Sequence, residues 1–168
     1  MKKRVPAALA AMLLLSLPAL ASPSEVAAPK GAKLLLAASA EGVQIYACEA
    51  KDRHFAWVFK APEAALFNAE GRQIINHFGG PGWKAEDGSL VTGEVIGKSD
   101  APVSGAIPWL LLRAKSHEGA GILAKAGFIR RIDTMAGSAP GSDCDAAEAG
   151  KEARMRYSAT YEFYEAAD

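Results

Sequence analysis

The stretch from His77 to Asp87 holds the densest group of side chains able to do chemistry. It places an imidazole at His77, an indole at Trp83, an amine at Lys84 and carboxylates at Glu86 and Asp87 within one short segment. An imidazole titrates near neutral pH and can therefore act as a general base. A nearby carboxylate would orient its ring. The pattern is typical of a ligand-contacting loop, or of a small hydrolase or lyase that uses His77 with Asp87.

The same stretch also has an ordinary structural explanation. The glycines and proline at positions 79–82 shape a tight connection, and Asp87-Gly88 is a strong turn signal because glycine adopts positive φ at no steric cost. His77 is then a surface residue. Trp83, between a glycine and a lysine, is the tryptophan expected to be most exposed. Because loops on rigid scaffolds often bind ligands, His77, Trp83, Lys84 and Asp87 remain the candidate ligand-binding residues.

Other catalytic and metal-binding patterns are absent from the sequence. His54, His77 and His117 are far apart, without HxH or HExxH spacing, so no metal site is predicted. Ser89 and Ser104 are available hydroxyls, but there is no G-x-S-x-G elbow. No cofactor is predicted, and the catalytic residues of any enzyme stay unknown.

Two arginine pairs would suit an anionic ligand. Arg130 and Arg131 are adjacent, and Arg154 and Arg156 share one face of a predicted strand. A solvated strand face is the ordinary explanation for both pairs.

Period-two alternation predicts the elements that position these side chains. Residues 43–48 and 54–59 alternate on either side of Lys51-Asp52, which is typical of a hairpin. Two more hairpins are predicted, one linking residues 65–67 to 73–75 and one linking Trp83 to residues 90–92.

The second half of the chain continues the β pattern. Residues 107–112 and 128–134 are strand candidates, residues 119–126 form one short helix, and 139–150 form a loop. The final strand is the clearest, because residues 155–163 sort apolar and polar side chains onto opposite faces. Many short strands with close turns predict a mostly β fold, an antiparallel sandwich or barrel with at most one or two short helices.

Cys48 and Cys144 are the only cysteines in the chain. In an oxidising compartment an isolated pair in one domain most simply forms a disulfide, so we predict this bridge. A metal or redox pair is the alternative, although no CxxC spacing supports it.

The start of the chain has the three parts of a cleavable secretory signal. Lys2, Lys3 and Arg4 precede an apolar run. Ala19-Leu20-Ala21 then supplies the small-x-small pattern that a signal peptidase recognises. We therefore predict a signal peptide over residues 1–21, a flexible lead-in over 22–30 and a single β domain over 31–168. The apolar run is too short for a transmembrane anchor, so the expected location is periplasmic or extracellular.

Charge argues against one class of partner. The chain carries 19 Lys and Arg against 19 Asp and Glu, and removal of the signal would leave an acidic excess. A nucleic-acid partner is not expected, because it would need a clustered basic surface. The leading hypothesis is an exported, non-catalytic binding or surface-associated module. Its ligand would be a small molecule, a glycan or an envelope protein.

Several motifs in one order also resemble a known family. They are Gly42–Cys48, His77–Trp83 with Asp87–Val91, Ile107–Leu111, Ile129–Thr134 and Tyr157–Tyr164. Together they resemble an exported bacterial and fungal domain of unknown function, number 3455, over about residues 30–165. The resemblance implies no established activity, although some members carry a malate dehydrogenase label.

A dehydrogenase would need a dinucleotide-binding motif. Residues 119–124 fit the GxGxxG/A pattern. That motif works only in a βαβ unit with an acidic residue about 20 positions further on. Asp133 comes too early, and few βα repeats are visible. A helical turn between strands explains these glycines better.

Overall fold

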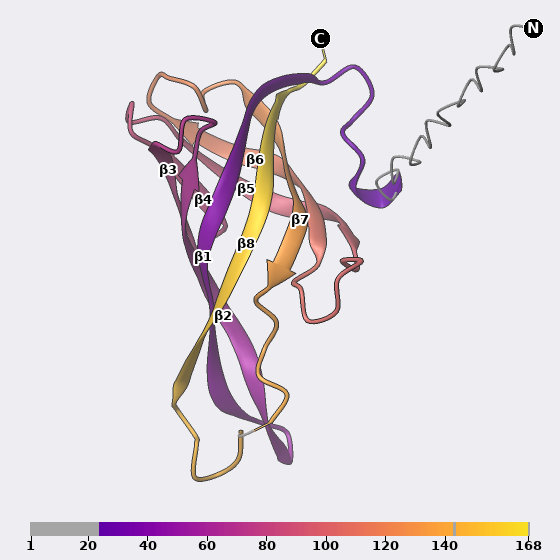
Figure 1. Ribbon diagram of the computed structural model, residues 1–168, viewed down its shortest axis with the longest axis vertical. Helices are drawn as coiled ribbons and strands as arrows, with labels where there is room; N and C mark the ends of the chain where they lie inside the picture. The colour runs from indigo at the N-terminus through magenta and orange to yellow at the C-terminus, as the bar shows by residue number, and fades with distance from the viewer. Residues whose placement is uncertain (1–23, 143, 168) are drawn as a thin grey trace, which may run out of the picture.

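The computed structural model describes residues 24–142 and 144–167, and these residues fold into one eight-stranded antiparallel sheet (Figure 1). A three-residue 3-10 helix, η1 (Ser24–Val26), precedes the sheet. The strands are β1 (Lys33–Lys51), β2 (His54–Phe67), β3 (Gln73–Phe78), β4 (Gly82–Ala85), β5 (Leu90–Ser99), β6 (Trp109–Glu118), β7 (Ala126–Ala136) and β8 (Glu152–Glu165). The predicted signal peptide, residues 1–21, lies outside the described residues.

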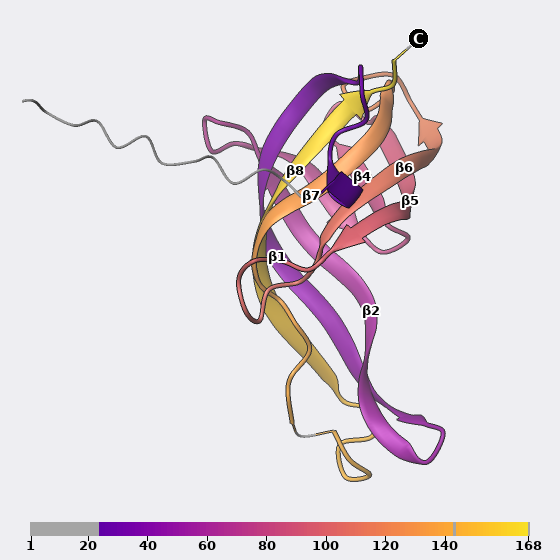
Figure 2. The same cartoon turned by 90° about the vertical axis from the view of Figure 1, so that its right-hand side faces the viewer.

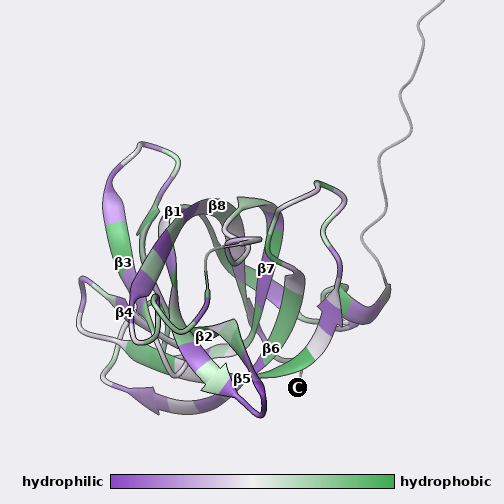
Figure 3. Cartoon of the chain, turned by 90° about the horizontal axis from the view of Figure 1, so that it is seen from below, coloured by the Kyte–Doolittle hydropathy of each residue, from purple (hydrophilic) through white to green (hydrophobic). Residues whose placement is uncertain are grey.

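The sheet closes into a barrel. Each strand pairs with its neighbour in the sequence, and β8 pairs with β1 to complete the ring. Seen along the barrel, the strands surround a common interior (Figure 3). Because the ring of strands is closed, the backbone N–H and C=O groups that an edge strand would leave unpaired form hydrogen bonds with a neighbouring strand. The predicted mostly β, antiparallel fold is therefore confirmed in its barrel form.

The core is made by the side chains that alternate inward along the strands. On β8, Tyr157, Ala159, Tyr161 and Phe163 are buried, which is the face predicted from the sequence. The largest fully buried side chains come from six different strands and from the β6–β7 connection: Leu66, Ile75, Trp83, Leu112, Leu123, Ile129, Tyr161 and Phe163. Because the contributing strands surround the interior, the core lies inside the barrel.

All three predicted hairpins are present. They pair β1 with β2, β2 with β3, and β4 with β5, and Asp52, with a φ of 56°, lies in the first turn. The predicted helix over 119–126 is wrong. Residues 119–125 form turns between the antiparallel strands β6 and β7. Gly119 and Gly121 have positive φ there, a conformation that turns use and an α-helix does not. The segment is thus no part of a βαβ unit.

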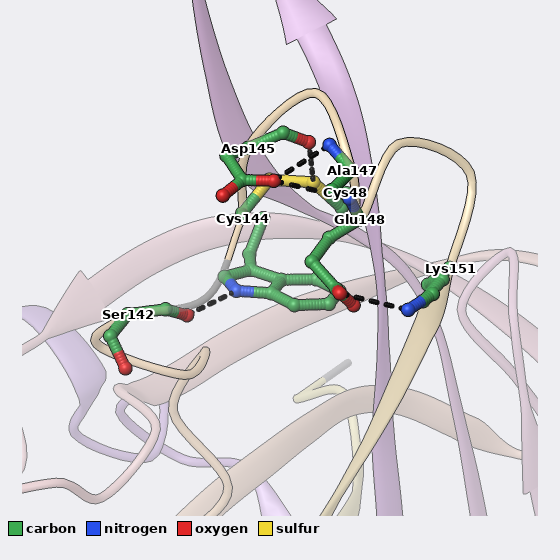
Figure 4. The surroundings of a disulfide bond; sticks show 8 residues. Cys48, Ser142, Cys144, Asp145, Ala147, Glu148 and Lys151 are labelled. Atoms are coloured by element: carbon green, nitrogen blue, oxygen red, sulfur yellow. Dashed lines mark hydrogen bonds and ion pairs between the residues drawn. A yellow bond between two sulfur atoms is a disulfide. The ribbon is translucent and has the colours of Figure 1, made fainter.

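β1, β2 and β8 are longer than the other strands and continue beyond the barrel as a twisted stem (Figure 2). A disulfide between Cys48 on β1 and Cys144 in the β7–β8 loop lies on this stem (Figure 4). The predicted bridge is confirmed, and the loop over 139–150 is fastened by it. Trp57 of β2 adds a hydrogen bond from its indole Nε1 to the carbonyl oxygen of Ser142, at 2.9 Å.

The segment before β1 packs on the outside of the barrel. Val26 is fully buried, and Nε of Arg130 donates to its carbonyl oxygen at 2.7 Å. Arg130 also forms an ion pair with Glu162, at 2.6 Å. This part of the expected flexible lead-in, residues 24–26, is thus held to β7 by contacts that the local sequence does not reveal. The described part of the chain holds no helix with the length and hydropathy needed to cross a membrane.

Candidate functional site

The barrel interior contains two hollows that meet. The first, the His77 hollow, is about 310 Å³ and is lined by residues from β2 through β8. The second, the Gln44 hollow, is about 350 Å³ and adds Gln44 and Tyr46 of β1. They share Phe59, Val95, Leu110 and Arg131. We call the two together the barrel cavity. Eight-stranded barrels are wide enough to hold one small ligand, and each hollow is at the lower end of the range for small-molecule pockets.

The cavity opens at the barrel end that faces away from the chain termini. The β3–β4 turn, residues 79–81, and the Pro108 segment line it, and both connections lie at that end. Phe59 and Val95 line both hollows while being 49% and 51% exposed, so they mark an apolar mouth. Lys60 lines the first hollow and Lys98 the second, and both are exposed. The entrance is therefore apolar with a basic margin.

His77 lies inside the barrel, not on the surface. It is 4% exposed, its ring stacks on Trp83 with centroids 4.6 Å apart, and Tyr161 lies at 5.2 Å. Its Nδ1 is 2.8 Å from the carbonyl oxygen of Gly82. Because a carbonyl only accepts, Nδ1 carries the proton, and Nε2 of the neutral ring is left as an acceptor.

The expected exposure of Trp83 is wrong. Trp83 is 1% exposed and packs edge-on against Tyr161 and Phe163, with ring centroids 6.0 Å apart in each case. Its glycine and lysine neighbours suggested a loop, but they belong to β4, where alternation sends Trp83 inward and Lys84 outward. Trp83 lines the His77 hollow, so it still contacts the candidate site, from within the core.

Asp87 and Lys84 lie elsewhere. The Asp87 carboxylate accepts hydrogen bonds from the Ser89 hydroxyl at 2.6 Å, the Ser89 amide at 2.9 Å and the Ile122 amide at 2.8 Å. These bonds, the Ser89 hydroxyl first, lower the pKa of Asp87. They fasten the β4–β5 turn to the β6–β7 connection at the barrel end nearer the termini. Asp87 therefore makes no contact that orients His77, and Lys84 is exposed on the outer face.

Arg131 lines the cavity, although the sequence pattern does not settle which way it faces. It pairs with Tyr161 across β7 and β8, is 9% exposed and lines both hollows. Its neighbour Arg130 faces the outside of the sheet, so the two arginines do not form one patch. The inward direction of Arg131 could have been inferred from alternation along β7, because Arg131 is two residues from the buried Ile129 and shares its face.

The groups around Arg131 are neutral near pH 7. Burial raises the pKa of Tyr46, Tyr157 and Tyr161, and the Arg131 charge only partly offsets this rise. Burial lowers the pKa of His77 to about 4, and the nearby Arg131 charge adds to that lowering, while the bond to Gly82 opposes it. Arg131 is therefore a permanent positive charge among uncharged aromatic groups inside the barrel.

The described cavity walls combine a weakly basic histidine with mostly apolar surface. Among the described residues no carboxylate is bonded to His77, and its low pKa makes it a weak base. No group of three or more potential metal ligands occurs among residues 24–142 and 144–167. What the cavity offers is apolar surface, aromatic rings and a few buried donors, which is the composition of small-molecule pockets.

Burial of neutral His77 predicts a pH-dependent stability. The folded-state pKa of about 4 lies below the ordinary histidine pKa of 6.5, so as pH falls the unfolded chain takes up this proton first. The stabilisation is complete above pH 6.5 and is lost as pH falls towards 4, by about 3 kcal/mol in total. Urea titrations at pH 7 and pH 4 measure the loss.

His77→Phe is the matched variant for this experiment, because a phenyl ring can still stack on Trp83 but cannot titrate. Carboxylates contribute equally to the pH dependence of both proteins and cancel in the difference. The wild type should lose about 3 kcal/mol more than His77→Phe between the two pH values. Equal losses would show that His77 titrates as an exposed histidine does.

Comparison with known proteins identifies the family but not an activity. The family model described as "Protein of unknown function (DUF3455)" matches residues 29–165, which include all eight strands. No curated protein and no solved structure matches the chain.

Proposed function

The chain belongs to this family of proteins of unknown function, and we propose that it is an exported binding protein that holds a small, mainly apolar molecule inside its barrel. The observation that carries the proposal is the barrel cavity, two joined hollows of about 310 Å³ and about 350 Å³ lined from all eight strands. A cavity with aromatic and aliphatic walls favours burial of apolar ligand surface, worth about 25 cal/mol per Å².

Three further observations support binding. The mouth residues Phe59 and Val95 are large, apolar and about half exposed, so an apolar ligand would shield surface that is otherwise in water. The indole Nε1 of Trp83 and the amide Nε2 of Gln44 are buried without a hydrogen-bond partner among the described residues. Buried donors of this kind are satisfied when a ligand supplies an acceptor.

Export is the second part of the proposal. The amino-terminal residues have the composition of a secretory signal. The bridge between Cys48 and Cys144 supports the same conclusion, because disulfides persist in oxidising compartments and are rare in the cytosol. Ligand capture would then take place in the periplasm or outside the cell.

A neutral apolar fluorophore, N-phenyl-1-naphthylamine, tests whether the cavity binds small molecules. Its fluorescence should rise on addition of the protein and saturate at one molecule per chain. Val95→Trp should weaken binding at least tenfold, since the larger ring fills the mouth that Val95 lines.

Ile96→Trp is the matched control. Ile96 is the next residue on β5, is 46% exposed and lines neither hollow. Its replacement should leave the affinity for the fluorophore unchanged. The proposal fails if the fluorescence does not saturate, or if the two tryptophan variants weaken binding equally.

A further inference from the structure

The buried guanidinium of Arg131 has no carboxylate partner within the described part of the chain. None of the ion pairs among residues 24–142 and 144–167 includes it. It donates hydrogen bonds from Nε at 3.2 Å and from Nη2 at 2.9 Å to the carbonyl oxygen of Pro108, and it also hydrogen-bonds to the Tyr161 side chain. Arg130, on the opposite face of β7, has Glu162 as its partner. Burying a charge without a counter-ion is costly, so the position of Arg131 calls for an explanation.

Arg131 keeps donors available. A guanidinium carries five N–H groups, and the Pro108 carbonyl engages one on Nε and one on Nη2. Of the three left on Nη1 and Nη2, one serves the hydrogen bond between Arg131 and the Tyr161 side chain, and two remain. These form the edge that binds the two oxygens of a carboxylate side by side. The bond to Pro108 also fixes the plane of the guanidinium, so little side-chain freedom would be lost on binding.

Among the residues that the structure describes, none that lines the barrel cavity is acidic. The charged side chains on its walls and rim are Arg131, Lys60 and Lys98. Lys60 is paired with Glu49, and Lys98 forms none of the ion pairs found in the described part of the chain. The tyrosines and His77 around Arg131 are neutral near pH 7, because burial raises the pKa of the phenols and lowers the pKa of the imidazole. The negative charge that would complement Arg131 is thus not supplied by the cavity walls.

We propose that the ligand of the barrel cavity is an amphipathic carboxylate, whose carboxylate accepts hydrogen bonds from the free edge of Arg131 and whose apolar part fills the His77 hollow. The inference rests on the proposed binding function and adds the chemical class of the ligand. Lys98 at the rim of the second hollow favours the approach of an anion. The apolar part packs among Trp83, Leu110 and Leu112.

Decanoate and 1-decanol form a matched pair for the test. They share a ten-carbon chain of a length suited to a hollow of about 310 Å³ and differ in the charge of the head group. Each is used to displace N-phenyl-1-naphthylamine from the wild-type protein at pH 7.5. Decanoate should displace the fluorophore with at least tenfold higher affinity than 1-decanol, and the preference should shrink as salt is added.

Arg131→Met removes the charge and keeps a long, flexible side chain. This variant should bind the two molecules with equal affinity while still binding the fluorophore. Arg156→Met is the control, because Arg156 is an exposed arginine on β8 that lines neither hollow. It should retain the wild-type preference for decanoate.

The outcomes separate the two proposals. Equal affinity of the wild type for decanoate and 1-decanol overturns the carboxylate inference and leaves the binding function standing. Failure of the fluorophore itself to bind overturns the binding function. Loss of the preference in Arg156→Met but not in Arg131→Met would place the anion outside the barrel and overturn the inference. The comparison within the wild type holds even if Arg131→Met does not fold.

Discussion

Replacement of Trp83 by alanine is expected to lower the free energy of unfolding by about 3–5 kcal/mol. Trp83 is among the largest fully buried side chains, and it is enclosed by His77 at 4.6 Å and by Tyr161 and Phe163 at 6.0 Å each, measured between ring centroids. Truncation removes this apolar burial and enlarges the existing hollow, because closed strands cannot collapse to fill the space. Urea denaturation followed by circular dichroism measures the change.

Two variants make this result interpretable. Trp83→Phe keeps an aromatic ring and should lose clearly less stability than Trp83→Ala. Trp57→Ala removes a half-buried tryptophan from the stem, where its loss leaves the barrel core intact, and it should also cost less. A loss below about 1 kcal/mol for Trp83→Ala would mean that Trp83 is a surface residue, as its sequence neighbours suggest.

Removal of the disulfide by the double substitution Cys48→Ser and Cys144→Ser is expected to cost about 4 kcal/mol. The two cysteines are 96 positions apart, so the bridge closes most of the domain into one loop and restricts the unfolded chain. In the folded state, the backbone of Cys48 already hydrogen-bonds to the end of the same loop. Its amide donates to the Lys151 carbonyl at 2.9 Å, and its carbonyl accepts from the Gly150 amide at 2.8 Å.

Reduction of the wild type supplies the control for this prediction. In the presence of a thiol reductant, its urea midpoint should fall to that of the double serine variant, which itself should not respond to the reductant. The denatured, non-reduced wild type should contain no titratable thiol, since both cysteines are in the bridge. A double variant as stable as the oxidised wild type would contradict the loop-closure account.

The hairpins could be predicted because their signals are local. Period-two alternation and the turns after Lys51, at Asn68 and at Asp87-Gly88 fix which residues pair, and the structure has these pairings. The choice between barrel and sandwich could not be predicted. It depends on the pairing of β1 with β8, the first and last strands, and no local pattern encodes such a distant contact.

The candidate site was predicted only in part. His77 on β3 and Trp83 on β4 lie directly opposite each other in the paired strands, and their rings stack. Two residues of the predicted stretch therefore do contribute to the cavity. Asp87 was grouped with them because it is near in sequence, but the turn carries it to the other end of the barrel. Arg131 was missed as an interior residue, because adjacent arginines are usually read as a solvated face and only closure of the sheet decides which of them faces inward.

Ligand binding inside the barrel is tested most directly by methyl chemical shifts, measured by NMR during a titration with decanoate. Leu110, Leu112 and Val95 line the cavity, whereas Leu34 and Ile122 are exposed apolar residues that line neither hollow. We predict that the methyl signals of the first three shift and saturate together at one decanoate per chain, while those of Leu34 and Ile122 stay in place. Shifts confined to Leu34, Ile122 or other surface methyl groups, with unchanged signals from Leu110 and Leu112, would contradict the account.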